Sequence, residues 1–346
     1  MGQLENQVNQ RIVDSEVKKQ KKGFWWIWIL VIPILVIAGV VWYLGTIKKE
    51  AEKTVDTTTA NSVGQTKNSN DKKNQNQYNW STMDKGPYRD KVSYATGTSL
   101  TSWTNSNKIL AEHASVPDAI VKDGIIQIYF VDVSEDGKAE RIGHLQSSDN
   151  GKSWSDKSII SIKGLGDKVA VDPSPYLLDD GKIRLYYFDI SKTMSEGLEN
   201  NAMYSAISTD GINFTEEEGV RFKYRAIFDP DVIKVGGVWR MYVGTDDQKV
   251  LSATSSDGLT FTYEGVALSD GAIPNVVYEN NIYYLFTGTG GISISTSKDG
   301  KTFTKTSNRF DSGGLTADPG VVKLGENNYF MVYKTADSMS KPTPQN

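Results

Sequence analysis

Short runs of alternating apolar and polar residues, separated by turns rich in Gly and Asp, fill the chain from about residue 91 onward. The best-defined set predicts strands over 174–178, 183–188 and 203–208. Asp-Gly turns at 179–181 and 209–211 would close the hairpins that follow the first and third of these strands. The pattern therefore predicts units of four antiparallel strands.

The same unit occurs five times, and each copy begins at a proline. Successive prolines lie 44 to 57 residues apart, and each is followed by an aromatic-rich strand. A strand-built repeat of about 40 to 55 residues is typical of a β-propeller blade. The five copies begin at Val116-Pro117-Asp118-Ala119, Asp172-Pro173-Ser174-Pro175, Asp229-Pro230-Asp231-Val232, Ile273-Pro274-Asn275-Val276 and Asp318-Pro319-Gly320-Val321.

The count of strands indicates how the ring closes. The fifth copy has only its first two strands, and candidates for the missing pair lie at 92–96 and around 100–103. Pairing the two ends would leave no open sheet edge. We therefore predict an all-β, five-bladed β-propeller over residues 91–336, closed by N-terminal strands and followed by a flexible tail at 337–346.

A long apolar stretch precedes the repeats. Residues 24–45 are 22 residues without a charge, which is long enough to cross about 30 Å of hydrocarbon. Lys and Arg are in excess on the N-terminal side, so 1–23 is expected to be cytoplasmic and the propeller extracytoplasmic. This predicts a single-pass transmembrane helix in the lipid bilayer of the cell membrane. A cleaved signal peptide is disfavoured by the length of the run and by the lack of a small-x-small site.

Composition refines this organisation. Residues 46–90 predict a low-complexity linker that carries the propeller as a stalk. Its stretch 57–79 has almost no apolar residue and is expected to be disordered. The chain has no Cys, which excludes disulfides, and a net charge of −4. No basic stripe or nucleic-acid motif is present, so nucleic acid is not an expected partner.

A second motif, Ser-x-Asp-Gly-x-x-Phe, marks the turn between the third and fourth strands of each unit. Asp can accept backbone hydrogen bonds inside the turn, Gly allows a positive φ, and the aromatic ring can pack between sheets. We therefore expect a structural role for its Asp. The copies are 208–214, 255–261 and 297–303, with a variant one residue longer at 147–154, and their Asp residues are Asp149, Asp210, Asp257 and Asp299.

Candidate chemistry lies at the residue before each repeated proline, because the innermost strands of a propeller line its axis. Asp172, Asp229 and Asp318 occupy this position in three copies, and Val116 and Ile273 occupy it in the other two. Three nearby carboxylates raise the pKa of at least one of them. Such a set provides the acid and base of glycoside hydrolysis. Alternatively, Asp before Pro is a common turn starter, and three equivalent copies can be repeat inheritance.

The Asp-Pro strand starts, the Asp-Gly hairpins and the Ser-x-Asp-Gly-x-x-Phe turns resemble the furanosidase-like superfamily of glycoside hydrolases, which contains families 43, 62, 32 and 68. The similarity covers about residues 91–335, and residues 172–181 are the best local match. The resemblance implies an inverting glycosidase, with Asp318 as base, Asp172 as modulator of the acid and Asp229 as acid. The family places a Glu in a Glu-Gly-Pro setting where this chain has Phe228-Asp229-Pro230, and its first-blade Asp-Pro is Val116-Pro117 here.

Weaker candidates surround the expected pocket. His113, Asp118, Tyr224 and Arg225 lie near strand starts and are candidate substrate contacts, whereas His144 is expected away from the axis. Clustered Asp oxygens suit Ca²⁺, but no EF-hand or His-rich spacing supports a metal, and no cofactor is expected. Two functions stay open: a glycosidase-like protein, or a non-catalytic surface module that binds carbohydrate or protein.

Overall fold

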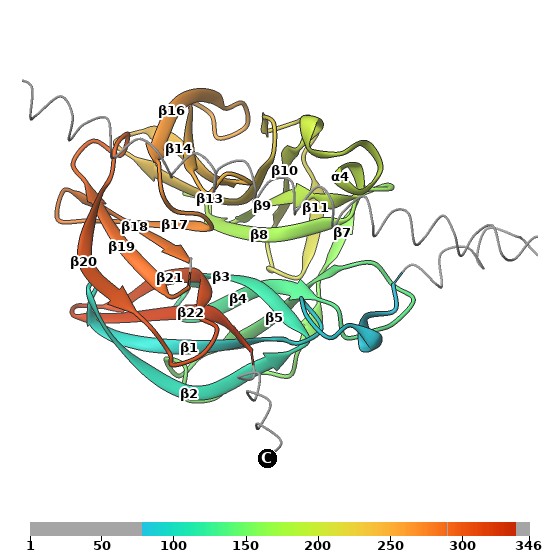
Figure 1. The fold of residues 1–346 in the computed structure, drawn as a ribbon, viewed down its shortest axis with the longest axis horizontal. Helices are drawn as coiled ribbons and strands as arrows, with labels where there is room; N and C mark the ends of the chain where they lie inside the picture. Colours follow the sequence, from blue (N-terminus) through green and yellow to red (C-terminus); the bar gives the residue numbers. More distant parts are fainter. Residues whose placement is uncertain (1–77, 289, 337–346) are drawn as a thin grey trace, which may run out of the picture. The chain divides into compact units, whose positions relative to one another are not determined.

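The computed structural model describes residues 78–288 and 290–336, and within them five sheets stand around one axis (Figure 1). The predicted five-bladed β-propeller is confirmed. The innermost strands β3, β8, β13, β17 and β21 contact one another in turn around the axis. The predicted span at 24–45, most of the stalk and the tail at 337–346 lie outside the described residues. No helix in the described part of the chain is long and apolar enough to cross a membrane.

The blades follow the sequence order of the repeats, from the inner strand outward. Blade 1 is β3 (Ala114–Lys122), β4 (Ile125–Asp132), β5 (Arg141–Ser147) and β6 (Ser158–Ile159). Blade 2 is β8 (Ala170–Leu177), β9 (Ile183–Asp189), β10 (Ala202–Ser208) and β11 (Asn213–Glu216), extended by β7 (Ser161–Lys163) and β12 (Phe222–Lys223). Blade 3 is β13 (Ile227–Val235), β14 (Val238–Thr245), β15 (Val250–Ser255) and β16 (Thr262–Leu268). Blade 4 is β17 (Pro274–Glu279), β18 (Ile282–Gly288), β19 (Ile292–Ser297) and β20 (Thr304–Phe310).

Blade 5 joins the two ends of the described chain. Its strands, again from the axis outward, are β21 (Ala317–Gly325), β22 (Asn328–Ala336), β1 (Asp90–Ser99) and β2 (Ser102–Glu112). β1 and β22 pair antiparallel, with Tyr94 opposite Val332. The N-terminal strands therefore complete the last blade, as their sequence predicts, although both are longer than the segments 92–96 and 100–103.

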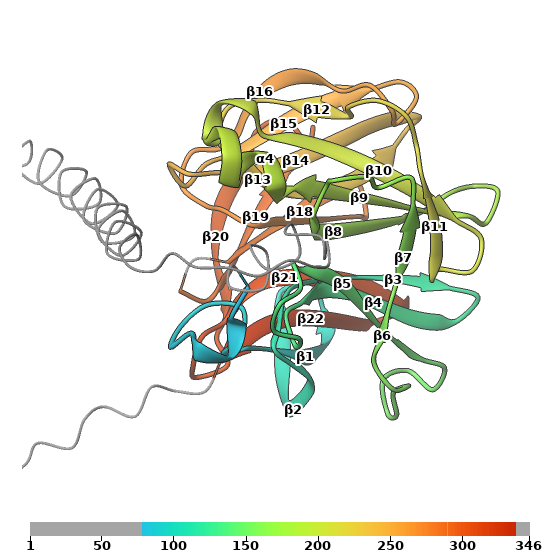
Figure 2. The same cartoon turned by 90° about the vertical axis from the view of Figure 1, so that its right-hand side faces the viewer.

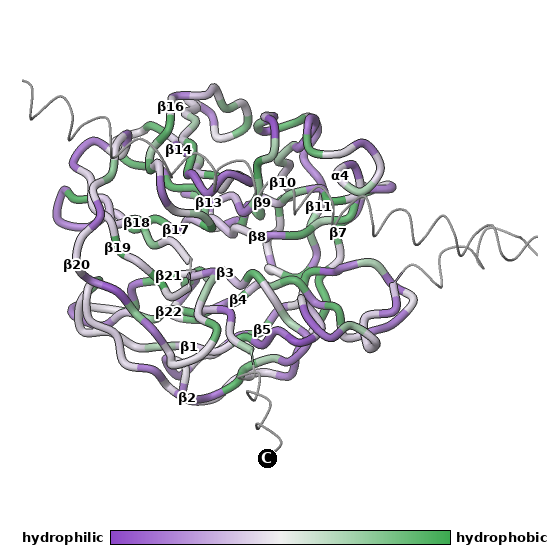
Figure 3. The backbone as a smooth tube through the Cα atoms, viewed as in Figure 1, coloured by the Kyte–Doolittle hydropathy of each residue, from purple (hydrophilic) through white to green (hydrophobic). Residues whose placement is uncertain are grey.

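The second strand of each blade forms the core. All seven residues of β9 are buried, which explains why it reads as a nearly continuous apolar run rather than as an alternating one. Figure 3 shows hydrophobic residues concentrated within the strands, while many of the outer loops are hydrophilic. Burial on both faces identifies these strands as the layer against which neighbouring blades pack.

The Ser-x-Asp-Gly-x-x-Phe turns connect neighbouring blades. Their Asp side chains accept hydrogen bonds from the turn's own Ser and backbone amides, as predicted. A buried tyrosine hydroxyl of the preceding blade donates to the turn's Gly carbonyl, and the turn's Phe packs edge-on against the same ring. The tyrosine–glycine pairs are Tyr129–Gly211 (3.0 Å), Tyr186–Gly258 (2.8 Å) and Tyr242–Gly300 (2.6 Å), and the rings that meet these tyrosines are Phe214, Phe261 and Phe303.

Strand pairing determines which connections surround the axial residues. The start of each inner strand pairs with the end of the second strand, as Ala114 pairs with Asp132 and Ala317 with Lys334. The β4–β5 connection (residues 133–140) and the β9–β10 connection therefore lie on the same face as the repeated prolines. The β9–β10 connection contains the helix α4 (Ile190–Glu196) and the 3₁₀ turn η2 (Leu198–Asn200), which the sequence did not predict.

The segment that enters the propeller, residues 78–89, also lies on this face and contains the 3₁₀ turn η1 (Trp80–Thr82). Figure 2 shows it, in blue, on the same side of the propeller as α4. Trp80 is 8% exposed, and its Nε1 donates to the Lys138 carbonyl at 2.8 Å. The described end of the predicted stalk therefore packs against blade 1.

Candidate functional site

The residue before each repeated proline has a left-handed backbone in all five blades. The φ angles are 46° at Val116, 52° at Asp172, 48° at Asp229, 56° at Ile273 and 50° at Asp318. In four blades this position lies in a β-bulge, where the inner strand shifts register against the second strand. A bulge turns a side chain away from its regular direction. These residues therefore line a cavity on the axis instead of alternating with the strand.

Two of the aspartates cap the backbone of the next blade. Asp172 Oδ2 accepts from the Asp229 amide at 3.3 Å, and Asp318 Oδ2 accepts from the Val116 amide at 3.3 Å. These contacts join blades 2 and 3, and blades 5 and 1. The capping role proposed for Asp before Pro is therefore present, but it links blades rather than starting a local turn.

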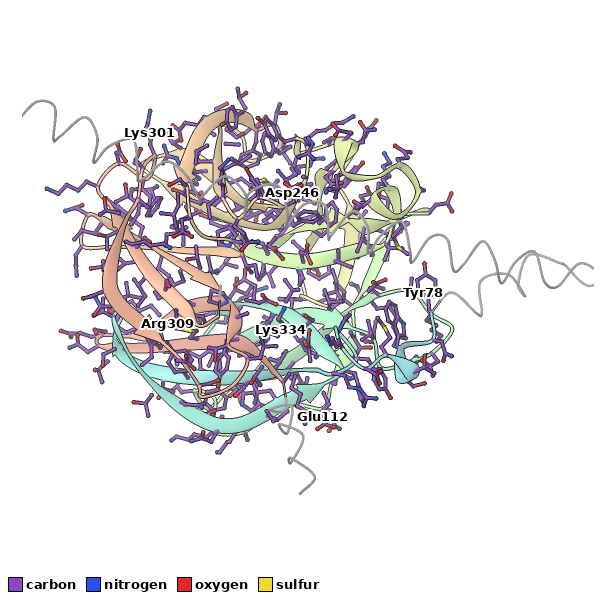
Figure 4. All side chains as sticks on the ribbon, viewed as in Figure 1. Tyr78, Glu112, Asp246, Lys301, Arg309 and Lys334 are labelled. Carbon is purple, nitrogen blue, oxygen red and sulfur yellow. The ribbon has the colours of Figure 1, made fainter. Side chains whose placement is uncertain are left out.

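A half-buried lysine provides the counter-charge of the axial aspartates. Lys334, on β22, contacts Asp318 Oδ2 at 2.7 Å, and the Asp318 side chain is 1% exposed. Burial alone would lower the pKa of Lys334, but Asp318 raises it, and the net shift is upward. Figure 4 shows Lys334 near the middle of the propeller and Lys301 at its periphery. Asp318 Oδ1 is buried and has no hydrogen-bond partner among the described residues.

The other two aspartates hold protons more tightly than ordinary carboxyls. Burial raises the pKa of Asp172 to about 7, with Asp318 and Glu140 adding to the rise. Burial, Asp172 and Asp318 together raise the pKa of Asp229 well above its usual value. Lys334 lowers both, but not enough to offset burial. Near neutral pH the pair therefore holds protons that an exposed Asp would have lost.

A second polar layer lies one step further along the strands, at the residue after each proline. Asn275 Nδ2 donates to Asp118 Oδ1 at 3.2 Å and to Asp231 Oδ1 at 3.1 Å, while Asp231 Oδ2 accepts from the Val276 amide at 2.7 Å. Burial raises the pKa of Asp231 to about 7, and burial and the charge on Asp231 raise that of Asp118. The candidate contact Asp118 is thus part of a buried network across the axis. Asp231 and Asn275 were not predicted, although the polar residue after Pro in four of the five copies was the available signal.

Two cavities adjoin these layers, and they differ greatly in size. The axial cavity, which Asp172, Asp229 and Asp318 line, has about 20 Å³, room for about one water molecule. A second pocket of about 260 Å³ lies beside the axis and has Asp172 and Asp229 in its wall. Ligand pockets usually begin near 300 Å³, so the flanking pocket is the one whose size approaches that of a single sugar ring. Asp318 lines only the axial cavity.

A glutamate that the sequence analysis did not single out also lines the flanking pocket. Glu140 is the last residue of the β4–β5 connection, and burial raises the pKa of its carboxyl. Its Oε2 is buried and has no hydrogen-bond partner among the described residues. Because Glu140 belongs to no repeated motif, only its position in space connects it with Asp172 and Asp229.

The remaining candidates line neither cavity. His113 Nδ1 lies 2.7 Å from the Tyr88 carbonyl, and its ring stacks on Tyr88 at 3.9 Å. Tyr224 is 41% exposed and stacks on Tyr263.

Arg225 contacts Glu199 at 3.0 Å on the surface, and His144 is buried on β5, away from the axis. Across residues 78–288 and 290–336, no group of three or more His, Asp or Glu side chains is arranged to hold a metal ion.

Comparison with known proteins agrees with the fold. No family model and no curated protein matches the sequence. Among solved structures, an endo-1,4-β-xylanase from Bacteroides thetaiotaomicron has a TM-score of 0.52 at 15% identity, covering 67% of this chain and 87% of its own. A GH43_1 enzyme from Xanthomonas citri, complexed with xylotriose, has a TM-score of 0.52 at 14% identity, covering 64% and 87%.

A GH32 β-fructofuranosidase from Bombyx mori has a TM-score of 0.51 at 15% identity; the match covers 76% of this chain and only 62% of the fructofuranosidase. The chain is a five-bladed β-propeller with structural neighbours among glycoside hydrolases. At these identities the likeness establishes the fold. The function has to be argued from the site.

Proposed function

We propose that this chain is a membrane-anchored, extracytoplasmic propeller that acts on glycans and resembles a glycoside hydrolase in mechanism. The observation that carries the proposal is the position of Asp172 and Asp229, which line a pocket of about 260 Å³. The pKa of each is raised, that of Asp172 to about 7. A carboxyl that keeps its proton beside one that can lose it is the minimum set for glycosidic bond hydrolysis. The fold that this chain shares with glycoside hydrolases also supports this proposal.

The resemblance suggests roles within the ring. Asp229 would protonate the leaving oxygen, Asp172 would modulate the pKa of Asp229, and Asp318 would activate water. The axial cavity has room for about one water, which suits an inverting reaction in which water attacks from the face opposite the leaving group. Lys334 offsets the charge of Asp318 from the side of β22.

A non-catalytic carbohydrate-binding or protein-binding module is the second candidate, and one observation favours it. The ring carboxylates already serve the fold: Asp172 caps the Asp229 amide, and Asp318 caps the Val116 amide and pairs with Lys334. A ring that retains these contacts can persist after catalysis is lost. The membrane anchor rests on residues 24–45 of the sequence alone.

Hydrolysis assays distinguish the two candidates. The purified protein is incubated with a panel of aryl glycosides and with plant and bacterial polysaccharides, next to Asp229→Asn. The control is Asp123→Asn, which changes an exposed Asp with a similar left-handed φ of 52°. Hydrolysis that falls at least about 100-fold in Asp229→Asn, but not in the control, supports the enzyme. Absence of hydrolysis by wild type, with binding to a glycan array, selects the binding module.

A further inference from the structure

The longer variant of the Ser-x-Asp-Gly turn, in blade 1, lacks one contact that the turns of blades 2 to 4 share. In those turns the Gly carbonyl accepts from a tyrosine of the preceding blade that lies opposite the residue after Pro, as Tyr129 lies opposite Asp118. Blade 1 is preceded by blade 5, where Val332 lies opposite Gly320 at the same position. Valine has no hydroxyl, so it cannot donate to the Gly151 carbonyl of the blade 1 turn.

Trp154 supplies the missing hydrogen bond and remains partly exposed. Its Nε1 donates to the Gly151 carbonyl at 3.2 Å, and its ring packs against Phe330, with ring centroids 5.6 Å apart. The aromatic residues at the same position of the other three turns are only 2–7% exposed, whereas Trp154 is half-buried. Part of the indole is therefore free to contact a ligand.

A pocket of about 250 Å³, the turn pocket, lies beside Trp154. Its wall consists of Trp154, Ile125, Gln146 and the four serines Ser147, Ser148, Ser153 and Ser155. Its volume is close to that of the flanking pocket and to the lower end of the range for ligand pockets. Among the described residues no charged side chain lines it, whereas three carboxyls line the flanking pocket.

The polar groups of the turn pocket are of two kinds. The hydroxyls of Ser147 and Ser153 hold the turn together, because they donate to Asp149 at 2.8 and 2.6 Å. The side chains of Gln146 and Ser148 are exposed and form no hydrogen bond with the rest of the described chain. An amide and a hydroxyl can each donate and accept, as the hydroxyls of a sugar also can.

The turn pocket lies toward the opposite face of the propeller from the repeated prolines. Ser147, at the end of β5, pairs with Ile126 near the start of β4, whereas the start of the inner strand β3 pairs with the end of β4. β4 has eight residues, which is about 25 Å of extended strand. A single sugar ring therefore cannot contact the turn pocket and the flanking pocket at once.

We propose that the turn pocket is a further, non-catalytic site that binds one unit of a neutral saccharide. The exposed part of the Trp154 ring covers the apolar C–H face of the sugar, while Gln146 and Ser148 bond its hydroxyls. A uronate, phosphate or ammonium group would lose water without meeting an opposite charge in the wall, so a neutral sugar is favoured. Binding at the turn pocket does not require hydrolysis at the flanking pocket.

A glycan array followed by calorimetric titration tests this assignment on the purified full-length protein. The array carries neutral oligosaccharides of xylose, arabinose, glucose, mannose and galactose, with oligosaccharides of galacturonic acid as the charged probes. The oligosaccharide that binds best is titrated into wild type, Gln146→Ala, Trp154→Leu and Asp229→Asn. Trp103→Leu is the matched control, because Trp103 Nε1 also donates within its own turn, to the Leu100 carbonyl at 3.2 Å, but lies outside the turn pocket.

Wild type should bind neutral oligosaccharides, and Gln146→Ala and Trp154→Leu should each weaken the affinity about tenfold or more. Trp103→Leu and Asp229→Asn should bind as wild type does. Binding that is lost in Asp229→Asn and kept in both turn-pocket variants places the sugar in the flanking pocket and overturns the turn-pocket site. Binding of galacturonic acid oligosaccharides alone overturns the ligand class. Absence of binding to every saccharide overturns the further site and leaves hydrolysis at the flanking pocket as a separate question.

Discussion

Asp172 should make the stability of the propeller depend on pH, and one substitution should remove that dependence. Burial raises the pKa of its carboxyl to about 7, from 3.8 for an ordinary Asp. The folded state therefore binds the proton more tightly than the unfolded chain does. Stability from this group is fully present below about pH 4 and is lost as the pH rises through 7. Asp172→Asn replaces the titrating group with a neutral one of similar size.

The magnitude follows from the two pKa values. Between pH 5 and pH 8, a single group that titrates at 3.8 in the unfolded chain and about 7 in the fold lowers the free energy of unfolding by about 2–3 kcal/mol. Asp172 and Asp229 influence each other's titration, so about 2–3 kcal/mol is an upper value for Asp172 alone. The Asn side chain can still accept from the Asp229 amide, which Asp172 Oδ2 meets at 3.3 Å. The variant should therefore fold.

Urea unfolding at pH 5 and pH 8 measures the effect. Between the two pH values, the free energy of unfolding of wild type should fall by about 2–3 kcal/mol more than that of Asp172→Asn. The variant should therefore become more stable relative to wild type as the pH rises. Asp123→Asn, which changes an exposed Asp with a φ of 52°, should follow wild type. Equal pH dependence in wild type and Asp172→Asn would refute the argument that this carboxyl is protonated in the fold at neutral pH.

Two further substitutions test how the ring and the blades are held together. Lys334→Met leaves Asp318 buried without its counter-charge and should cost about 3–5 kcal/mol at pH 7, most of which Asp318→Asn should restore in the double variant; additive losses in the urea titrations would contradict the pairing. Tyr242→Phe removes the donor to the Gly300 carbonyl and should cost about 1 kcal/mol, whereas the exposed Tyr263→Phe should cost little. Equal urea midpoints for the two tyrosine variants would argue against the inter-blade hydrogen bond.

The fold is largely predictable from the sequence because its signals are local and repeated. Pro at each inner strand and Ser-x-Asp-Gly at each outer turn fix the register of a blade without reference to distant residues. The missed element α4 shows the limit of this reasoning. It has no buried residue, so no apolar period marks it, and its main signals are the Asp189 N-cap and Gly197 at its end. Trp80, at the edge of a polar stretch, is likewise buried although no periodic pattern surrounds it.

The candidate site is less predictable, because two of its five charged residues belong to no repeated motif. Asp172, Asp229 and Asp318 follow from the position before Pro, which the bulges turn toward the axis. Lys334 and Glu140 belong to no repeated motif. Lys334 lies on β22 opposite Ala317 of the neighbouring strand β21, so only the exact register of that hairpin brings it to Asp318. Glu140 comes from a connection of blade 1 and meets Asp172 and Asp229 of blades 2 and 3 only in the folded propeller.

The five blades share a backbone conformation before Pro, but they differ in the charged residues that surround it. The left-handed backbone before Pro occurs at Val116 and Ile273 as well as at the three aspartates, so this conformation belongs to the fold and is not evidence for catalysis. The asymmetry lies in charge. The cation Lys334 meets the ring from blade 5, while Glu140 lies beside Asp172 and Asp229 on blades 1 to 3. A ligand on the axis would have only about 20 Å³, whereas a ligand beside blades 1 to 3 meets carboxyls with raised pKa values in a space of about 260 Å³. The chemistry of this propeller is therefore to be sought at the flank of its axis.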